Sequence, residues 1–424
     1  MSELKKQIIR NERVNEQYTR IEHPSGVTIC LCPMKGFSST YALFGTKYGS
    51  VDSTFKTKSD DDFVTVPAGI AHFLEHKLFE NEDCDVFKLY AETGANANAY
   101  TSFDKTAYLF LCSQNFGKNL EILLKFVQEP YFTDETVQKE QGIIAQEIKM
   151  YDDSPNWRVF FNCLEAVYHN NPVRINIAGT VDTIAEIDKD LLYRCYHTFY
   201  NLNNMVISIA GSFDPVEALE ICDRLLKPSE DIGLQAVIPE EPYGVSEKIV
   251  REKLPVGMPL FQIAFKLPNE YAAMTEKYIF YNIMIETALG KASKFYLEAY
   301  ESGLINETFN VGVFNGRGFF LCVADGEARE PEKVCEAIKA ELKRLKVAGL
   351  CEEDFVRIKK RSYGELISMF ASAESVASEM MNAEFEGKTV YDYIETTAAV
   401  TFDDITAILK DFDEENSCLS IIEN

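Results

Sequence analysis

The two halves of this chain repeat one another, and this repetition constrains the fold more than any single motif. An amphipathic helical pattern, a short turn with an acidic helix cap and a second long helix occupy 120–147 and again 335–365. Acidic residues at such a turn are typical of helix starts. In each half, these two helices are followed by a further helix and then by a closing strand pattern, which lies at 205–210 in the first half and at 418–422 in the second. We therefore expect two homologous domains.

A segment rich in helix- and strand-breaking residues separates the halves. The stretch from Lys227 to Val245 contains three prolines and two glycines among acidic residues, a density that interrupts regular structure. A chain of 424 residues is also too long for one compact core. We expect a first domain over 1–230, a linker over 231–245 and a second domain over 246–424.

The order of the predicted elements indicates the fold class. Strand patterns precede each helical block, at 27–32, 41–48 and 107–111 and then at 261–265, 309–314 and 319–323. Strands and helices that are grouped, rather than strictly alternating, favour an α+β fold. We expect each domain to be a mostly antiparallel sheet packed with helices.

The strongest chemical motif is His72-Phe73-Leu74-Glu75-His76. Residues four apart on a helix lie one above the other, so His72 and His76 can hold one metal ion. Glu75 lies between them in sequence and can lean over the same ion. A carboxylate there could take a proton from a water that the metal has made more acidic.

A zinc ion held by two histidines needs a third protein ligand. Glu147 is the best candidate, and Glu140 falls two turns earlier on roughly the same helical face. Both lie in an acidic helix, so simple solvation of these carboxylates is the alternative.

The repeat also indicates which half carries the metal. Aligning Glu147 with Glu365 places Gly290 and Lys294 opposite the two histidines of the motif. The second half has no histidines there, so we expect only the first half to bind metal.

These motifs resemble those of the pitrilysin/insulinase family of zinc peptidases, which share the inverted His-x-x-Glu-His order. The likeness is closest to short members related to the mitochondrial processing peptidases and covers most of 20–215. The matching segments are Gly69–His76, Gly49–Ser50, Gly94–Thr101, the Glu140 and Glu147 pair, Asn171–Val173 to Gly179–Thr180, and Asn204–Gly211. The resemblance implies a processing-peptidase-like metallohydrolase fold that hydrolyses peptides in an enclosed chamber.

The resemblance also implies roles for individual residues. It implies one Zn²⁺ per chain, held by His72, His76 and Glu147. It further implies that Glu75 is the general base and Glu140 a supporting acid.

In the family, an extended peptide adds a strand to a sheet edge beside the metal. The matching segment here is Ala97–Ser102, with Asn98 and Ala99 as the expected contacts. A strand of small residues without that role is the alternative.

The second half departs from the family pattern. Active members supply an Arg and a Tyr that stabilise the oxyanion, whereas the corresponding positions here are Ala299 and Asn306. Several short members work in pairs, so the resemblance implies a zinc-bearing subunit with a homologous partner. The alternatives are a self-sufficient monomer or homodimer, and a non-catalytic, zinc-stabilised binding subunit.

The composition excludes several partners. A net charge of −25 argues against nucleic acid and anionic membranes, which both select basic surfaces. The chain has no apolar run of membrane-spanning length and no signal-peptide pattern. Its scattered cysteines, without a Cys-x-x-Cys pair, are typical of reduced thiols, so we expect a cytoplasmic protein.

Overall fold

The computed structural model describes residues 5–82 and 85–424 and divides into two compact units. Of the described residues, the first unit comprises 5–82, 85–148, 176–237 and 367–391, and the second comprises 149–175, 238–366 and 392–424. Each unit thus takes most of its residues from one half of the sequence and a helical segment from the other half. The division at 231–245 concerns the homologous halves of the sequence and stays a prediction.

The first unit is built on a seven-stranded sheet in the order β1-β2-β3-β9-β4-β8-β7. Only β3 and β9 are parallel, and the other neighbours are antiparallel. The strands are β1 Lys5–Asn11, β2 Glu16–Glu22, β3 Thr28–Pro33, β4 Thr40–Thr46, β7 Asn96–Thr101, β8 Thr106–Cys112 and β9 Met205–Gly211. A small second sheet joins β10 (Gln235–Ala236), β5 (Thr54–Lys56) and β6 (Val64–Thr65).

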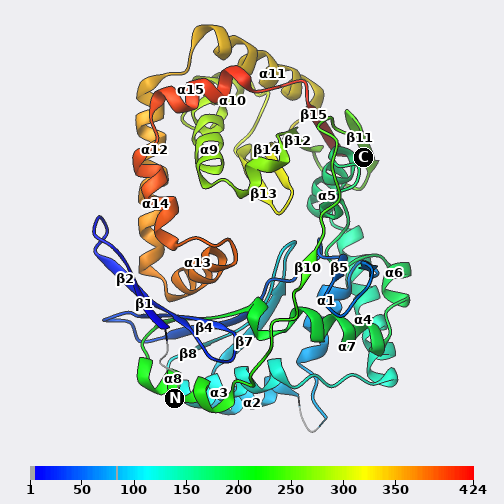
Figure 1. The fold of residues 1–424 in the computed structure, drawn as a ribbon. Helices are drawn as coiled ribbons and strands as arrows, with labels where there is room; N and C mark the ends of the chain where they lie inside the picture. The colour runs from blue at the N-terminus through cyan, green and yellow to red at the C-terminus, as the bar shows by residue number, and fades with distance from the viewer. Residues whose placement is uncertain (1–4, 83–84) are drawn as a thin grey trace. The chain divides into compact units, whose positions relative to one another are not determined.

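Helices cover both faces of the larger sheet, with α3 on one face and α13 on the other (Figure 1). The helices of this unit are α1 Ile70–Leu78, α2 Val86–Thr93, α3 Phe116–Gln128, α4 Asp134–Asp152 up to Ile148, α6 Val181–Ala185, α7 Lys189–Phe199, α8 Pro215–Leu225 and α13 Ala373–Phe385. Because both faces are covered, every residue of the central strands β4 and β9 is buried.

Helix α13 approaches the sheet closely at Gly45 of β4. A Cβ atom at Gly45 would lie 2.4 Å from Met381 Sδ, so a larger residue there would require the Met381 side chain to move. Arg20 of β2 donates two hydrogen bonds to Glu384, and Ser208 of β9 donates one to the Ala377 carbonyl. A helix from the second half of the sequence is therefore an integral part of the first unit.

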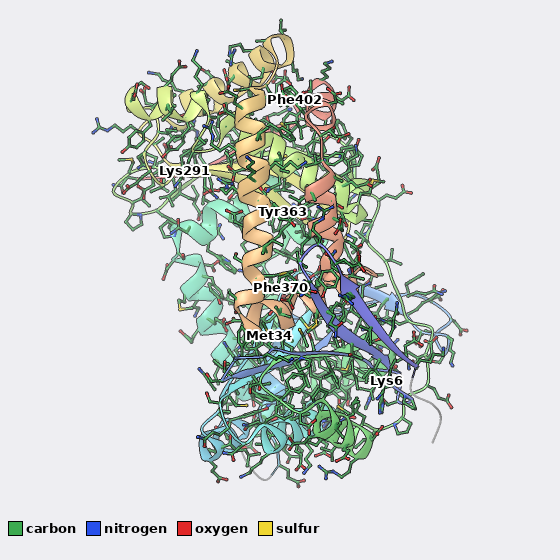
Figure 2. The ribbon with its side chains drawn as sticks, turned by 90° about the vertical axis from the view of Figure 1, so that its left-hand side faces the viewer. Lys6, Met34, Lys291, Tyr363, Phe370 and Phe402 are labelled. Carbon is green, nitrogen blue, oxygen red and sulfur yellow. The ribbon has the colours of Figure 1, made fainter. Side chains whose placement is uncertain are left out.

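The outer hairpin of this sheet, formed by β1 and β2, is more exposed to solvent than the central strands. Most side chains of β1 are exposed, Lys6 among them (Figure 2). An edge strand that carries lysines resists pairing with other chains.

The second unit contains a five-stranded sheet in the order β11-β15-β12-β14-β13. Figure 1 shows α5 on one face of this sheet and α9 and α11 on the other. The strands are β11 Ile249–Lys253, β12 Leu260–Lys266, β13 Asn310–Gly316, β14 Phe319–Glu327 and β15 Ser417–Glu423. The helices are α5 Pro155–Val167, α9 Thr275–Leu289, α10 Lys294–Glu301, α11 Pro331–Ala348, α12 Glu352–Ser368 up to Leu366, α14 Val390–Ala399 from Asp392 and α15 Phe402–Asp411.

The two sheets share one topology. Counted along the chain, β3-β9-β4-β8-β7 and β11-β15-β12-β14-β13 both place the strands in the order first, last, second, fourth, third. In both, the first and last strands are parallel and the other pairs antiparallel. The predicted α+β fold with two homologous domains is confirmed.

The prediction that Gly290 and Lys294 of the second half correspond to His72 and His76 is wrong. Gly290 ends α9 and Lys294 begins α10, so neither lies inside a helix that corresponds to α1. The segment between the second and third strands differs in length between the halves, so one constant offset does not hold there. All five histidines nevertheless lie in the first half, and the conclusion that the second half cannot supply two histidine ligands stands.

Across 5–82 and 85–424, no helix combines the length and apolar character that crossing a bilayer requires.

Candidate metal centre

The motif lies on α1, and the start of this helix is fixed by a close backbone contact. Gly69 caps the helix with φ at 92°, a left-handed conformation that favours glycine. A Cβ atom there would lie 2.4 Å from the Ala178 carbonyl oxygen. Ile70, Phe73 and Leu74 are buried in the core of the unit, which sets the rotation of the helix and aims both histidines at α4.

Helix α4 supplies the two acidic residues of the site. Its buried face contains Val137, Glu140, Ile144 and Ile148, spaced three and four residues apart. Glu147 lies beside this face, three residues after Ile144. The apolar residues anchor the helix, and the two carboxylates reach α1.

The predicted ligands converge on one point. Glu147 Oε1 lies 3.7 Å from His72 Nε2, and Glu147 Oε2 lies 3.4 Å from His76 Nε2. One donor atom from each of the three residues falls within 4.8 Å of the others. The sequence prediction therefore names residues that the fold brings together.

This donor set fits zinc. Two imidazole nitrogens and one carboxylate form a common zinc-ligand combination, which leaves a fourth position open. A tetrahedral ion with bonds of about 2.0–2.1 Å holds its ligands about 3.3 Å apart, close to the observed separations. Within the described part of the chain, this is the one such group of three metal-ligating residues.

Glu140 contacts a candidate ligand through the other ring nitrogen. Its Oε1 lies 3.0 Å from His76 Nδ1. A carboxylate at this nitrogen fixes the ring orientation and leaves Nε2 free to bind metal. His72 Nδ1 is buried, and among the described residues it has no hydrogen-bond partner.

Burial and the local charges shift the pKa values of the site in opposite directions. Burial, and then the neighbouring His76, lower the pKa of His72 to about 3. For His76, burial lowers the pKa, but the Glu140 hydrogen bond and the nearby carboxylates outweigh it and the pKa is raised. Burial raises the pKa of Glu75, although hydrogen bonds from Thr101 oppose this. His72 is thus held as the neutral imidazole that a metal requires.

Glu75 has a partner that the sequence did not reveal. Thr101 Oγ1 donates a hydrogen bond of 2.9 Å to Glu75 Oε2. Thr101 lies inside the recognised Gly94–Thr101 segment, but nothing in its spacing marks the hydroxyl as a partner of the acid. This hydrogen bond becomes apparent only in the folded structure, where the end of β7 lies beside α1.

The predicted substrate contacts lie on an edge strand. Among the described residues, β7 pairs only with β8 and ends the sheet. The Ala99 backbone N–H donates to Asn98 Oδ1 at 2.9 Å, so a local side chain satisfies this donor.

The two positions where Arg and Tyr are missing lie in the second unit. Ala299 is a buried residue of α10, and Asn306 accepts hydrogen bonds from the backbone N–H and hydroxyl of Thr308. Neither side chain can supply a charged or phenolic donor.

The paired α+β domains, with two histidines and a glutamate beside a further carboxylate, define a metal-dependent hydrolase. The sequence model described as Insulinase (Peptidase family M16) matches residues 66–181, and the one described as Peptidase M16 inactive domain matches 186–362. The chain is 38% identical to the uncharacterized zinc protease YmfH of Bacillus subtilis (strain 168), over 95% of both chains. The chain belongs to peptidase family M16, the insulinase family, and is a zinc peptidase.

Other relatives agree with this assignment. The zinc protease YmxG of Bacillus subtilis (strain 168) is 25% identical, over 84% of this chain and 88% of its own length. The crystal structure of an M16-like peptidase from Alicyclobacillus acidocaldarius superposes with a TM-score of 0.90 at 32% identity, over 100% of this chain and 99% of that one. A protease from Helicobacter pylori, with a TM-score of 0.81 at 18% identity over 99% and 100% of the chains, has the same fold.

Proposed function

We propose that the chain is the zinc-bearing subunit of an endopeptidase, with one Zn²⁺ held by His72, His76 and Glu147. The observation that carries this proposal is the convergence of one ring nitrogen from each histidine and one carboxylate oxygen within 4.8 Å. Three protein ligands suit a catalytic site, whereas a purely structural zinc site usually closes its fourth position with a protein ligand. The non-catalytic alternative is therefore disfavoured.

Each neighbouring residue has a distinct chemical task in this proposal. When bound, zinc acts as a Lewis acid that polarises the peptide carbonyl and makes water more acidic. Glu75 takes the proton of the attacking water and passes it to the leaving amine. Glu140 orients His76 through its 3.0 Å contact with Nδ1.

The proposed substrates are peptides or extended segments of proteins. The exposed edge of β7 accepts an extended backbone through main-chain hydrogen bonds, which read little sequence. Asn98 and Ala99 are the proposed contacts, and the peptide carbonyl replaces Asn98 Oδ1 on the Ala99 N–H. The enclosed reaction chamber implied by the family resemblance belongs to the same proposal.

A homologous partner subunit completes the site in this proposal. Ala299 has no polar side-chain atom, and the Asn306 amide nitrogen is directed at Met258 Sδ and Glu327 Oε2, so neither replaces the Arg and Tyr donors. Loss of one oxyanion donor typically costs about 10²–10³-fold in rate. A partner of the same family that carries the Arg and Tyr supplies them. In a homodimer, both subunits would lack the Arg and Tyr donors.

The proposal includes the domain roles and the compartment. The metal-binding domain spans 1–230, the metal-free domain 246–424, and 231–245 connects them. Within the described residues the cysteines are free thiols and most are buried, which agrees with a cytoplasmic location.

Peptide cleavage by the chain alone and with a partner tests this function. We expect the mixture with a homologous chain that carries the Arg and Tyr to cleave a quenched fluorescent peptide at least about 100-fold faster than this chain alone, because the missing oxyanion donors are restored. A zinc chelator should abolish this activity, and one equivalent of Zn²⁺ should restore it.

Two outcomes would contradict the proposal in different ways. Equal rates with and without the partner would show a self-sufficient peptidase. Cleavage that survives removal of all bound zinc, verified by elemental analysis, would refute the metal site.

A further inference from the structure

Thr101 forms the structural link between the acid of the motif and the edge strand. Its hydroxyl donates to Glu75 Oε2 at 2.9 Å, and Thr101 is the last residue of β7. Glu75 is on α1, so this hydrogen bond joins the helix of the metal ligands to the strand proposed to receive the peptide.

Thr106 of the neighbouring strand β8 holds Thr101 in position. Thr101 pairs with Thr106 across the β7–β8 ladder, and the two Oγ1 atoms are 3.4 Å apart. Thr106 is fully buried and donates to the Tyr48 carbonyl at 2.9 Å. The hydroxyl hydrogen of Thr106 is used in that bond with Tyr48. The hydroxyl hydrogen of Thr101 is donated to Glu75 instead.

The direction of this hydrogen bond matters for the two carboxylate oxygens. A threonine hydroxyl carries one hydrogen, and an ionised carboxylate only accepts. The Thr101 hydroxyl therefore donates to Oε2, and a backbone hydrogen bond from Thr101 also restrains the Glu75 carboxylate. A base that is held in one rotamer loses less time in unproductive orientations.

We propose that Thr101 is a positioning residue, which orients the Glu75 carboxylate toward the reacting water and couples the general base to the strand that binds substrate. This inference rests on the proposed role of Glu75 and extends it. Thr101 itself does not touch the metal ligands or exchange a proton with substrate.

Paired substitutions in the active preparation separate this role from packing. Thr101→Val keeps the shape and removes the hydroxyl, and we expect kcat to fall about 10–100-fold while KM stays within about twofold, because a misdirected base affects the chemical step. Thr101→Ser keeps the hydroxyl and should remain within about threefold of the wild type. Thr40→Val, which removes a buried hydroxyl elsewhere in the same sheet, is the matched control and should leave kcat unchanged.

The outcomes separate failure of this inference from failure of the proposed function. If Thr101→Val has wild-type kcat while Glu75→Gln is inactive, the base role stands and the positioning role is overturned. If Thr101→Ser loses as much activity as Thr101→Val, the lost contact is packing rather than the hydroxyl, which also overturns it. Activity retained by Glu75→Gln overturns the base role and the inference together.

Discussion

Replacing Glu75 by glutamine lowers kcat for peptide hydrolysis by about 10²–10⁴-fold, the usual contribution of a general base. Glutamine keeps the shape of the side chain but cannot accept a proton at neutral pH. Glu75 lies outside the group of three converging ligands, so zinc content should stay near one per chain. The measurement combines initial rates at saturating peptide with elemental analysis of the same preparation.

Glu135→Gln is the matched control for this experiment. Glu135 is an exposed acid in the first turn of α4, the helix that also carries Glu147. The same change of one carboxylate to an amide should leave kcat within about twofold, since surface charges away from the site contribute little to chemistry. A Glu75→Gln variant that keeps its zinc and more than a tenth of the wild-type rate would contradict the assigned base.

Replacing Lys266 by methionine destabilises the second unit by about 3–5 kcal/mol, as expected for a buried ion pair that loses one partner. Lys266 Nζ lies 2.7 Å from Glu241 Oε1, and each side chain is only 1% exposed. The Glu241 carboxylate also accepts backbone N–H donors from 169, 170 and 171. Without Lys266 a charged carboxylate remains buried, and the urea midpoint should fall.

Two further variants test whether the buried charge is the cause. The double variant Lys266→Met/Glu241→Gln should recover part of the lost stability, because it no longer buries an unpaired charge. Lys343→Met removes an exposed partner of Glu415 and should not measurably change the urea midpoint. A single variant as stable as the wild type would show that the pair does not secure the segment around Glu241.

The sequence predicted strands well where burial dominates and poorly where it does not. β4 and β9 are buried throughout and consist mostly of apolar residues. By contrast, β1 is almost entirely exposed and shows no alternation of apolar and polar residues, so its pattern could not be recognised. The core strands follow from composition, but the outer hairpin follows from tertiary pairing.

The exchange of helices between units could not be predicted. An amphipathic pattern shows that a helix buries one face, but it does not say which sheet receives that face. α5 follows the helix of Glu147 in sequence yet packs on β12 and β15, and α13 packs on β4 and β9. A division of the sequence at its linker therefore describes homologous halves rather than compact units.

In the candidate site, too, the sequence predicts local spacing but not contacts between distant segments. His72, Glu75 and His76 were visible because helical spacing is local. The contacts from Glu140 to His76 and from Thr101 to Glu75 join residues distant in sequence, and only the fold brings them together.

Anomalous diffraction at the zinc edge from crystals of the zinc-loaded chain tests the central claim most directly. We expect one anomalous peak per chain, bonded to His72 Nε2, His76 Nε2 and a Glu147 carboxylate oxygen at about 2.0–2.2 Å. A peak held by any other set of residues, or zinc-loaded crystals with no ordered peak between α1 and α4, would contradict the assigned metal centre.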